Sequence, residues 1–188
     1  MPFTLDSVVP WGRSFDEYTR MFVLSDEDLK QRILGCSDGP ASFNCILTAQ
    51  GGNVVSIDPL YGYSEEEIRK RIEDTSQEVL EQTQKHGEDF VWDRIPSVEA
   101  LGRTRMAAME LFLSDYQSGL QEKRYVEGSL PNLPFKNHEF ALALCSHFLF
   151  LYSATLSQDF HLQSIHELCR VAKEVRIFPL LEFGAQLS

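Results

Sequence analysis

A glycine-containing turn and a later aspartate are the residues whose types and spacing best suit ligand binding. The turn, Gly35-Cys36-Ser37-Asp38-Gly39, follows a short apolar run, and Asp58 ends a second one. Nineteen positions separate Gly39 from Asp58, close to the ~20-residue interval at which a β-α-β unit presents an acid to the hydroxyls of a ribose. Glycine lets the backbone approach a ligand closely, and a carboxylate accepts hydrogen bonds from two hydroxyl groups. The pattern therefore predicts a ribose-binding turn.

Each of these residues also has a structural explanation. Asp58 followed by Pro59 is typical of a turn that ends a strand. Asp38 can cap the helix expected to begin near Pro40 instead of contacting a ligand. His147 ends a long apolar run and is the imidazole best placed to act as a general base, with a reference pKa of ~6.5; a hydrogen-bonded structural role is the alternative. The upstream glycine turn favours ligand binding by Asp58. For Asp38 and His147, both the functional and the structural roles stay open.

Strand-like and helix-like segments alternate along the chain. Short apolar runs predict five strands, over 32–34, 54–57, 124–127, 140–144 and 174–178. Helical spacing of apolar residues and N-cap residues predict helices over 14–20, from 25, over 42–49, from 64, from 97 and over 157–172. This alternation predicts an α/β fold with a doubly wound, mostly parallel sheet of about five strands.

Two segments fall outside that simple alternation. Residues 61–123 exceed what a crossover between parallel strands needs, so we expect a helical insertion between the second and third strands that folds over one edge of the sheet. A solvated cover and a functional lid or acceptor-recognition wall are its two interpretations. Residues 1–30 are expected to form an N-terminal helical lid that covers the ligand with the cluster Trp11, Arg13, Phe15 and Tyr18, for which plain core packing is the alternative. The whole chain, 1–188, is predicted to be a single domain.

Composition narrows the range of partners. The chain has 188 residues, of which 43% are apolar and 24% charged, and its net charge is −11. Nucleic-acid binding requires a basic face, so we expect neither nucleic acid nor an anionic membrane as partner. We expect a cytoplasmic protein, because residues 1–9 do not resemble a signal peptide and the apolar run 140–152 is too short to span a bilayer. The four cysteines lack zinc-site spacing and are expected to be reduced thiols, with no metal site.

Four motifs, taken in order, resemble the class I S-adenosylmethionine-dependent methyltransferases, which have a Rossmann-like fold. They are the turn at 35–39, Ile57-Asp58-Pro59, the segment 133–147 and Glu167-Leu168-Cys169-Arg170-Val171. The resemblance implies S-adenosylmethionine as cofactor and a small-molecule methyl acceptor. It implies cofactor binding by Gly35, Cys36, Asp38, Gly39, Asp58, Pro59, Leu60, Ser129, Leu130, Cys145 and Ser146, and it makes His147 the candidate catalytic residue.

The chain departs from the family pattern at several positions. Ser37 replaces the middle glycine of the turn, and Ser129 stands where an aspartate is common. The sequence ends at Ser188, before the last helix and the antiparallel strand pair of this fold, so we expect an exposed sheet edge that could pair two copies into a homodimer. A non-catalytic S-adenosylmethionine-binding or interaction protein with the same fold is one alternative. An NAD-dependent oxidoreductase is another, disfavoured because Pro40 occupies the last glycine position of G-x-G-x-x-G.

Overall fold

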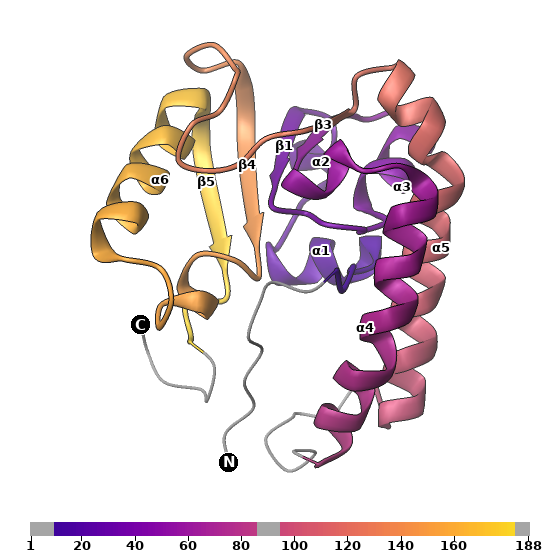
Figure 1. Cartoon of the computed structure of the whole chain (residues 1–188). Coiled ribbons are helices and arrows are strands. Elements are labelled where there is room, and N and C mark those ends of the chain that lie inside the picture. The colour runs from indigo at the N-terminus through magenta and orange to yellow at the C-terminus, as the bar shows by residue number, and fades with distance from the viewer. Residues whose placement is uncertain (1–9, 86–94, 183–188) are drawn as a thin grey trace.

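One five-stranded sheet forms the centre of the protein in the computed structural model, which describes residues 10–85 and 95–182 (Figure 1). Its spatial order is β3-β2-β1-β4-β5, and every neighbouring pair runs parallel. The strands are β1 (Arg32–Cys36), β2 (Asn53–Ile57), β3 (Tyr125–Val126), β4 (Phe140–Ser146) and β5 (Ala172–Phe178). The five predicted strands are confirmed. β4 continues to Ser146, beyond the predicted end, because its ladder with β5 extends to the pair Ser146 and Phe178.

Helices connect the strands and cover both faces of the sheet. The α-helices are α1 (Phe15–Met21), α2 (Asp26–Leu29), α3 (Phe43–Ala49), α4 (Glu65–Lys85), α5 (Val98–Gln121) and α6 (Gln158–Val171), and the 3-10 helices are η1 (Pro59–Gly62) and η3 (Phe150–Tyr152). Ser14, Ser25, Ser97 and Ser157 cap the N-termini of α1, α2, α5 and α6 with their side-chain oxygens. Such serines satisfy backbone N–H groups that lack a partner in the first turn, which explains why the helices begin where the sequence predicts.

The side chains of the central strands alternate between two apolar layers. Ile33 and Leu144 pack with α1 and α3 on one face, whereas Leu34, Ala143 and Cys145 pack with α6 on the other. Successive residues of a strand point to opposite faces, so continuous apolar runs such as 140–145 are buried on both sides. The doubly wound α/β architecture predicted from the sequence is therefore confirmed.

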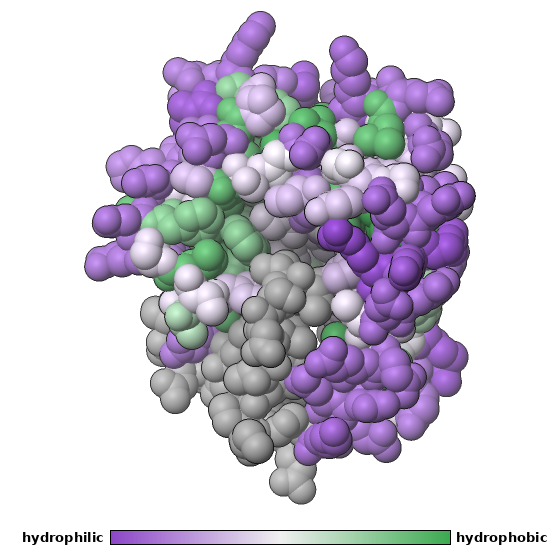
Figure 2. Space-filling view, viewed as in Figure 1, coloured by the Kyte–Doolittle hydropathy of each residue, from purple (hydrophilic) through white to green (hydrophobic). Residues whose placement is uncertain are grey.

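The predicted insertion between β2 and β3 is confirmed as the helix pair α4 and α5, which lie side by side at the β3 edge of the sheet (Figure 1). Ile68 and Ile72 of α4 meet Met109 and Phe112 of α5 in a third apolar cluster, which also holds Tyr125 of β3. The outward surface of α4 is hydrophilic (Figure 2), as expected of a solvated cover. The predicted connection at 86–94 lies outside the described residues.

Residues 10–29 pack onto the sheet as part of the core. Tyr18 and Phe22 are buried in the cluster that contains α3, so core packing is observed for this part of the predicted N-terminal lid. Residues 1–9 of that lid lie outside the described range. Within 10–85 and 95–182, none of the helices is both long enough and apolar enough to cross a membrane.

Candidate functional site

The carboxyl ends of the strands bring most of the predicted site residues to one edge of the sheet. Cys36 of β1 lies opposite Ile57 of β2 on one side and opposite Cys145 of β4 on the other. The next residues along these three strands are therefore Ser37, Asp58 and Ser146. The chain runs from β1 outward to β2 and β3, and then returns to the other side of β1 as β4. Ligands of open α/β sheets bind at such a reversal, outside the carboxyl ends of the strands.

Asp58 is bound directly to the glycine turn. The backbone N–H of Gly39 donates to Oδ2 of Asp58 at 2.9 Å, and the N–H of Leu60 donates to Oδ1 at 2.8 Å. The strand-ending turn suggested by Asp58-Pro59 is thus present, since Asp58 caps η1. Each carboxylate oxygen has a second lone-pair direction with which it can accept a further hydrogen bond.

The turn itself has open space in front of Gly39. Gly39 has φ +54°, and a Cβ at this position would meet nothing within 4 Å. Its carbonyl accepts a hydrogen bond from the Tyr61 hydroxyl at 2.8 Å, so both of its backbone polar groups are held. Ser37, at the middle glycine position, also has positive φ (57°). Such backbone conformations cost about 1–3 kcal/mol in a non-glycine residue and are concentrated at functional sites.

The insertion fixes the position of η1 and, through it, the glycine turn. Tyr116 of α5 donates its hydroxyl to the carbonyls of Tyr61 and Tyr63, at 3.0 and 2.9 Å. The Tyr61 ring packs against Phe112 and Tyr125, with centroids 5.9 and 5.1 Å away. Tyr61 in turn donates a hydrogen bond to the Gly39 carbonyl. Helix α5 therefore helps to hold the glycine turn in place, although it lies far from the turn in the sequence.

Asp38 lies in a buried network behind the turn. Its Oδ1 accepts from the Tyr18 hydroxyl at 2.7 Å and its Oδ2 from the Ser56 hydroxyl at 2.6 Å. Asp38 does not cap a helix, which was its alternative role. The N-cap residue of α3 is Ser42, and its side chain makes no capping hydrogen bond. Cofactor contact by Asp38 stays a prediction, and the observed partners join α1 and β2 to the turn.

Gly35 leaves the room that the Asp38 carboxylate occupies. A Cβ at position 35 would lie 1.8 Å from Asp38 Oδ2, so we expect Gly35→Ala to lower the free energy of unfolding by about 3 kcal/mol, measured by urea denaturation. The matched control is Gly102→Ala in α5, where the nearest atoms to the added Cβ are the flexible ends of the Leu80 side chain at 3.2 Å. An Asp38→Ala background should remove most of the cost of Gly35→Ala. Equal losses in both backgrounds would contradict this explanation.

Burial raises the pKa of both aspartates at the turn. For Asp38, burial outweighs the hydrogen bonds from Ser56 and Tyr18, and with the charge of Asp58 it raises the pKa to about 6. For Asp58, burial outweighs the N–H groups of Leu60 and Gly39, so its pKa is also raised. The folded protein therefore holds protons on these carboxylates more tightly than the unfolded chain does.

A pH dependence of stability follows from Asp38. Its pKa is about 6 in the folded protein and 3.8 ordinarily, so the folded state gains relative stability as the pH falls through this window. Relative to Asp38→Asn, the wild type should gain about 1 kcal/mol of unfolding free energy between pH 7 and pH 5. Urea denaturation at both pH values measures this difference. Parallel behaviour of the two proteins would show that Asp38 does not titrate there.

The end of β4 supplies Cys145, Ser146 and His147. Cys145 is buried against the α6 face, and Ser146 Oγ lies 2.8 Å from Nδ1 of His147. His147 has φ +51° and its ring packs on Phe178. Burial, followed by the charges of Arg13 and Arg105, strongly lowers the pKa of His147. A neutral imidazole of this kind is a weak base, so His147 is better suited to hydrogen bonding than to general-base catalysis.

The cysteines at the carboxyl edge are buried thiols. Cys36 and Cys145 are both free and buried, and Cys169 is exposed. The neighbouring Cys145 thiol, together with burial, raises the pKa of Cys36 well above its ordinary value. Protonated, buried thiols are unreactive. Among the described residues, no group of three or more His, Cys, Asp or Glu side chains is arranged to hold a metal ion.

The four remaining predicted residues follow β2 and β3, and two of them bury their side chains in apolar clusters. Leu60 is buried in the α4–α5 cluster, and Leu130 is buried on the α6 face. Ser129 follows β3 and forms a bridge with Asn132. Pro59 is exposed as the first residue of η1. Contact of these residues with a cofactor through the backbone stays a prediction.

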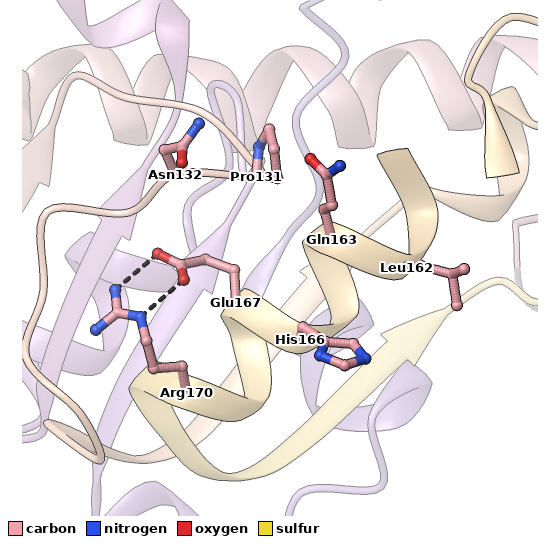
Figure 3. Close-up of a pocket in the computed structure, with 7 residues that line it drawn as sticks. All are labelled: Pro131, Asn132, Leu162, Gln163, His166, Glu167 and Arg170. Atoms are coloured by element: carbon pink, nitrogen blue, oxygen red, sulfur yellow. Dashed lines mark hydrogen bonds and ion pairs between the residues drawn. The ribbon is translucent and has the colours of Figure 1, made fainter. Parts of the chain in front are cut away.

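A separate open pocket of about 590 Å³ lies between α6 and the loop that follows β3 (Figure 3). The residues lining it are Pro131, Asn132, Leu162, Gln163, His166, Glu167 and Arg170. Glu167 and Arg170 form an ion pair on its wall. The carbonyl of Arg170 accepts a hydrogen bond from the His138 N–H, so this end of the pocket lies near the start of β4. None of the predicted site residues lines the pocket.

Several residues near the turn were not predicted. Glu17 of α1 and Arg105 of α5 form a buried ion pair, and Ser56 and Tyr61 hold Asp38 and Gly39. Arg105 carries a signal in the sequence, because it falls on the apolar stripe between Leu101 and Met109. A charged residue at a buried helix position indicates a paired or functional group.

Comparisons with known proteins give one informative relative. No protein family model matches the chain. The chain is 35% identical over 189 residues to the uncharacterized protein MJ0045 of Methanocaldococcus jannaschii, an alignment that covers 98% of this chain and 83% of that protein. Identity at this level over nearly the whole chain shows common descent, so the chain belongs to the same protein family as MJ0045 of Methanocaldococcus jannaschii.

Proposed function

We propose that this protein is an S-adenosylmethionine-dependent methyltransferase that acts on a small-molecule acceptor in the cytoplasm. The observation that supports this best is the 2.9 Å hydrogen bond between Gly39 N and Asp58 Oδ2. It joins the glycine turn of β1 to the carboxylate after β2, beside the reversal between β1 and β4. A nucleoside cofactor needs these two elements next to each other at this edge.

The residues at the edge fit such a cofactor. The space in front of Gly39 would be filled by any side chain, and the Asp58 oxygens keep lone pairs for ribose hydroxyls. In the proposed complex, Gly35, Cys36 and Gly39 would form the loop under the cofactor, with Gly39 allowing its close approach, and Asp58 would hold its ribose. Ser146 and the neutral His147 would lie beside the acceptor.

The chain's own residues contribute positioning to the reaction. When bound, the cofactor supplies a methyl group on a positively charged sulfur that is already activated for transfer. Alignment of two bound reactants and exclusion of water can account for most of the acceleration. The lowered pKa of His147 makes acceptors that need no strong base the best match, with His147 orienting them through a hydrogen bond.

The test is methyl transfer from labelled S-adenosylmethionine into a small-molecule cell extract, followed by separation of the labelled products. We expect label in at least one small molecule with the wild type and none with Asp58→Ala. A folded protein that binds the cofactor but transfers no label would favour the non-catalytic alternative. Transfer that persists unchanged in Asp58→Ala would contradict the proposed site.

A homodimer through β5 is also part of this proposal. Among the described residues, β5 is the last strand of the sheet, and it carries the half-exposed Phe178, followed by the exposed Leu180. An open strand edge with apolar side chains is suited to pair with a second copy.

Light scattering should give about twice the 21.5 kDa chain mass, and Leu180→Lys should shift the protein to monomer. Leu111→Lys, exposed on α5, is the control, and a monomeric wild type would contradict the dimer.

A further inference from the structure

The backbone at Arg13 lies against the residues that directly follow the glycine turn. A Cβ on Gly12 would lie 2.0 Å from the Pro40 carbonyl oxygen. The Ser42 N–H donates to the Arg13 carbonyl at 3.0 Å. The Arg13 guanidinium donates to the Trp11 carbonyl at 2.7 Å, and within the described residues it forms no ion pair.

Arg105 reaches the same place from α5. It is 6% exposed, and its Nη1 donates to Glu17 Oε2. Its Nε is buried and has no hydrogen-bond partner among the described residues. An unsatisfied donor on a buried guanidinium is costly, and a native protein normally satisfies it with protein, water or ligand.

The charges of this cluster do not balance. We call Arg13 and Arg105 the arginine pair; the one carboxylate bonded to it in the described structure is that of Glu17, which also accepts from Ser14. Burial, followed by the charge of Arg105, lowers the pKa of Arg13 to about 9. The pKa of His147 at the end of β4 is lowered by burial and then by both arginines. Glu17 adjoins Tyr18 in α1, and the Tyr18 hydroxyl donates to Asp38 of the glycine turn at 2.7 Å, so the arginine pair lies beside the turn.

We propose that the arginine pair is a binding subsite for one carboxylate group of a ligand held at the carboxyl edge of the sheet. Two guanidiniums opposed by one carboxylate leave a single positive charge, which one further carboxylate neutralises. A planar carboxylate also matches the two parallel donors of a guanidinium. The identity of the ligand rests on the proposed function: the carboxylate belongs to the amino-acid end of the cofactor or to the methyl acceptor.

Two nucleosides separate these sources. S-adenosylhomocysteine carries the amino-acid carboxylate, and 5′-methylthioadenosine lacks it. If the cofactor supplies the carboxylate, Arg13→Gln should weaken the binding of S-adenosylhomocysteine at least ~10-fold in isothermal titration. The affinity for 5′-methylthioadenosine should stay unchanged. Arg103→Gln, which removes an exposed arginine two residues from Arg105, is the control and should change neither affinity.

If the acceptor supplies the carboxylate, the readout is the melting temperature in sodium acetate, glutarate or benzoate, compared with chloride at equal ionic strength. At least one carboxylate should raise the melting temperature of the wild type, and Arg13→Gln should abolish this rise. Arg13→Lys, which keeps the charge without the planar fork, should retain part of it. This measurement needs no nucleoside, so it tests the subsite even if neither nucleoside binds and the proposed function fails.

The wild type alone can overturn the subsite. If no carboxylate raises its melting temperature above that in chloride, and S-adenosylhomocysteine binds no more tightly than 5′-methylthioadenosine, the arginine pair binds no carboxylate. Unchanged responses in a folded Arg13→Gln protein lead to the same conclusion.

Discussion

Glu17→Gln is expected to lower the free energy of unfolding by about 3–5 kcal/mol, because it leaves the buried Arg105 charge uncompensated. Side-chain exposure is only 7% for Arg105 and 11% for Glu17, so water cannot replace the lost carboxylate. Glutamine retains the hydrogen bonds of the capping box with Ser14, which isolates the effect of the charge. Urea denaturation at pH 7 measures the loss.

The control for this substitution is Glu27→Gln. Glu27 pairs with Lys30 on the surface, with side chains 80% and 68% exposed, and surface pairs contribute little. Burial raises the pKa of Glu17, but the hydrogen bond and charge of Arg105 outweigh it and lower the pKa. The stabilisation is thus present above pH 4.5 and lost as the pH falls through the lowered pKa. A loss at pH 7 no greater than that of Glu27→Gln would show that the pair is unimportant.

Asp58→Ala is expected to weaken S-adenosylhomocysteine binding about 100-fold or more. The proposed ribose contacts are two hydrogen bonds to a charged group, each contributing about 1.5–3 kcal/mol. The same substitution removes the acceptor of the Gly39 and Leu60 N–H groups, at a cost of about 1–3 kcal/mol in stability. Isothermal titration measures the binding, and thermal unfolding measures the stability.

Two further variants separate binding from folding. Asp58→Asn keeps one acceptor oxygen for the backbone and should be more stable than Asp58→Ala, yet still bind weakly. Asp74→Ala removes an exposed acid from α4 and should change neither property. A folded Asp58→Asn protein with wild-type affinity would exclude Asp58 from the binding site.

The strands and the turn could be predicted from the sequence because their signals are local. Apolar runs such as 140–144 mark strands buried on both faces, and serine caps mark where α1, α5 and α6 begin. The spacing of Gly39 and Asp58, 19 positions apart, follows from the length of one β-α-β crossover and indicates that both lie at the same edge of the sheet. Their direct hydrogen bond was not predicted.

The interactions behind the site could not be predicted, since they join residues far apart in the chain. Tyr18 and Asp38 are 20 positions apart, Tyr116 and Tyr61 are 55, and Arg105 and Glu17 are 88. No periodicity records which buried polar groups will meet. The inward turn of Asp38 depends on the room left by Gly35, a packing detail that a glycine motif does not specify.

Isothermal titration of the wild type with S-adenosylmethionine and S-adenosylhomocysteine tests the nucleoside site most directly. Saturable binding of both compounds to one site per chain, at micromolar concentration and lost in Asp58→Ala, is the expected result. A folded wild type that releases no heat with either compound, and whose melting temperature neither compound changes, would show that the edge formed by Gly39 and Asp58 does not bind this cofactor.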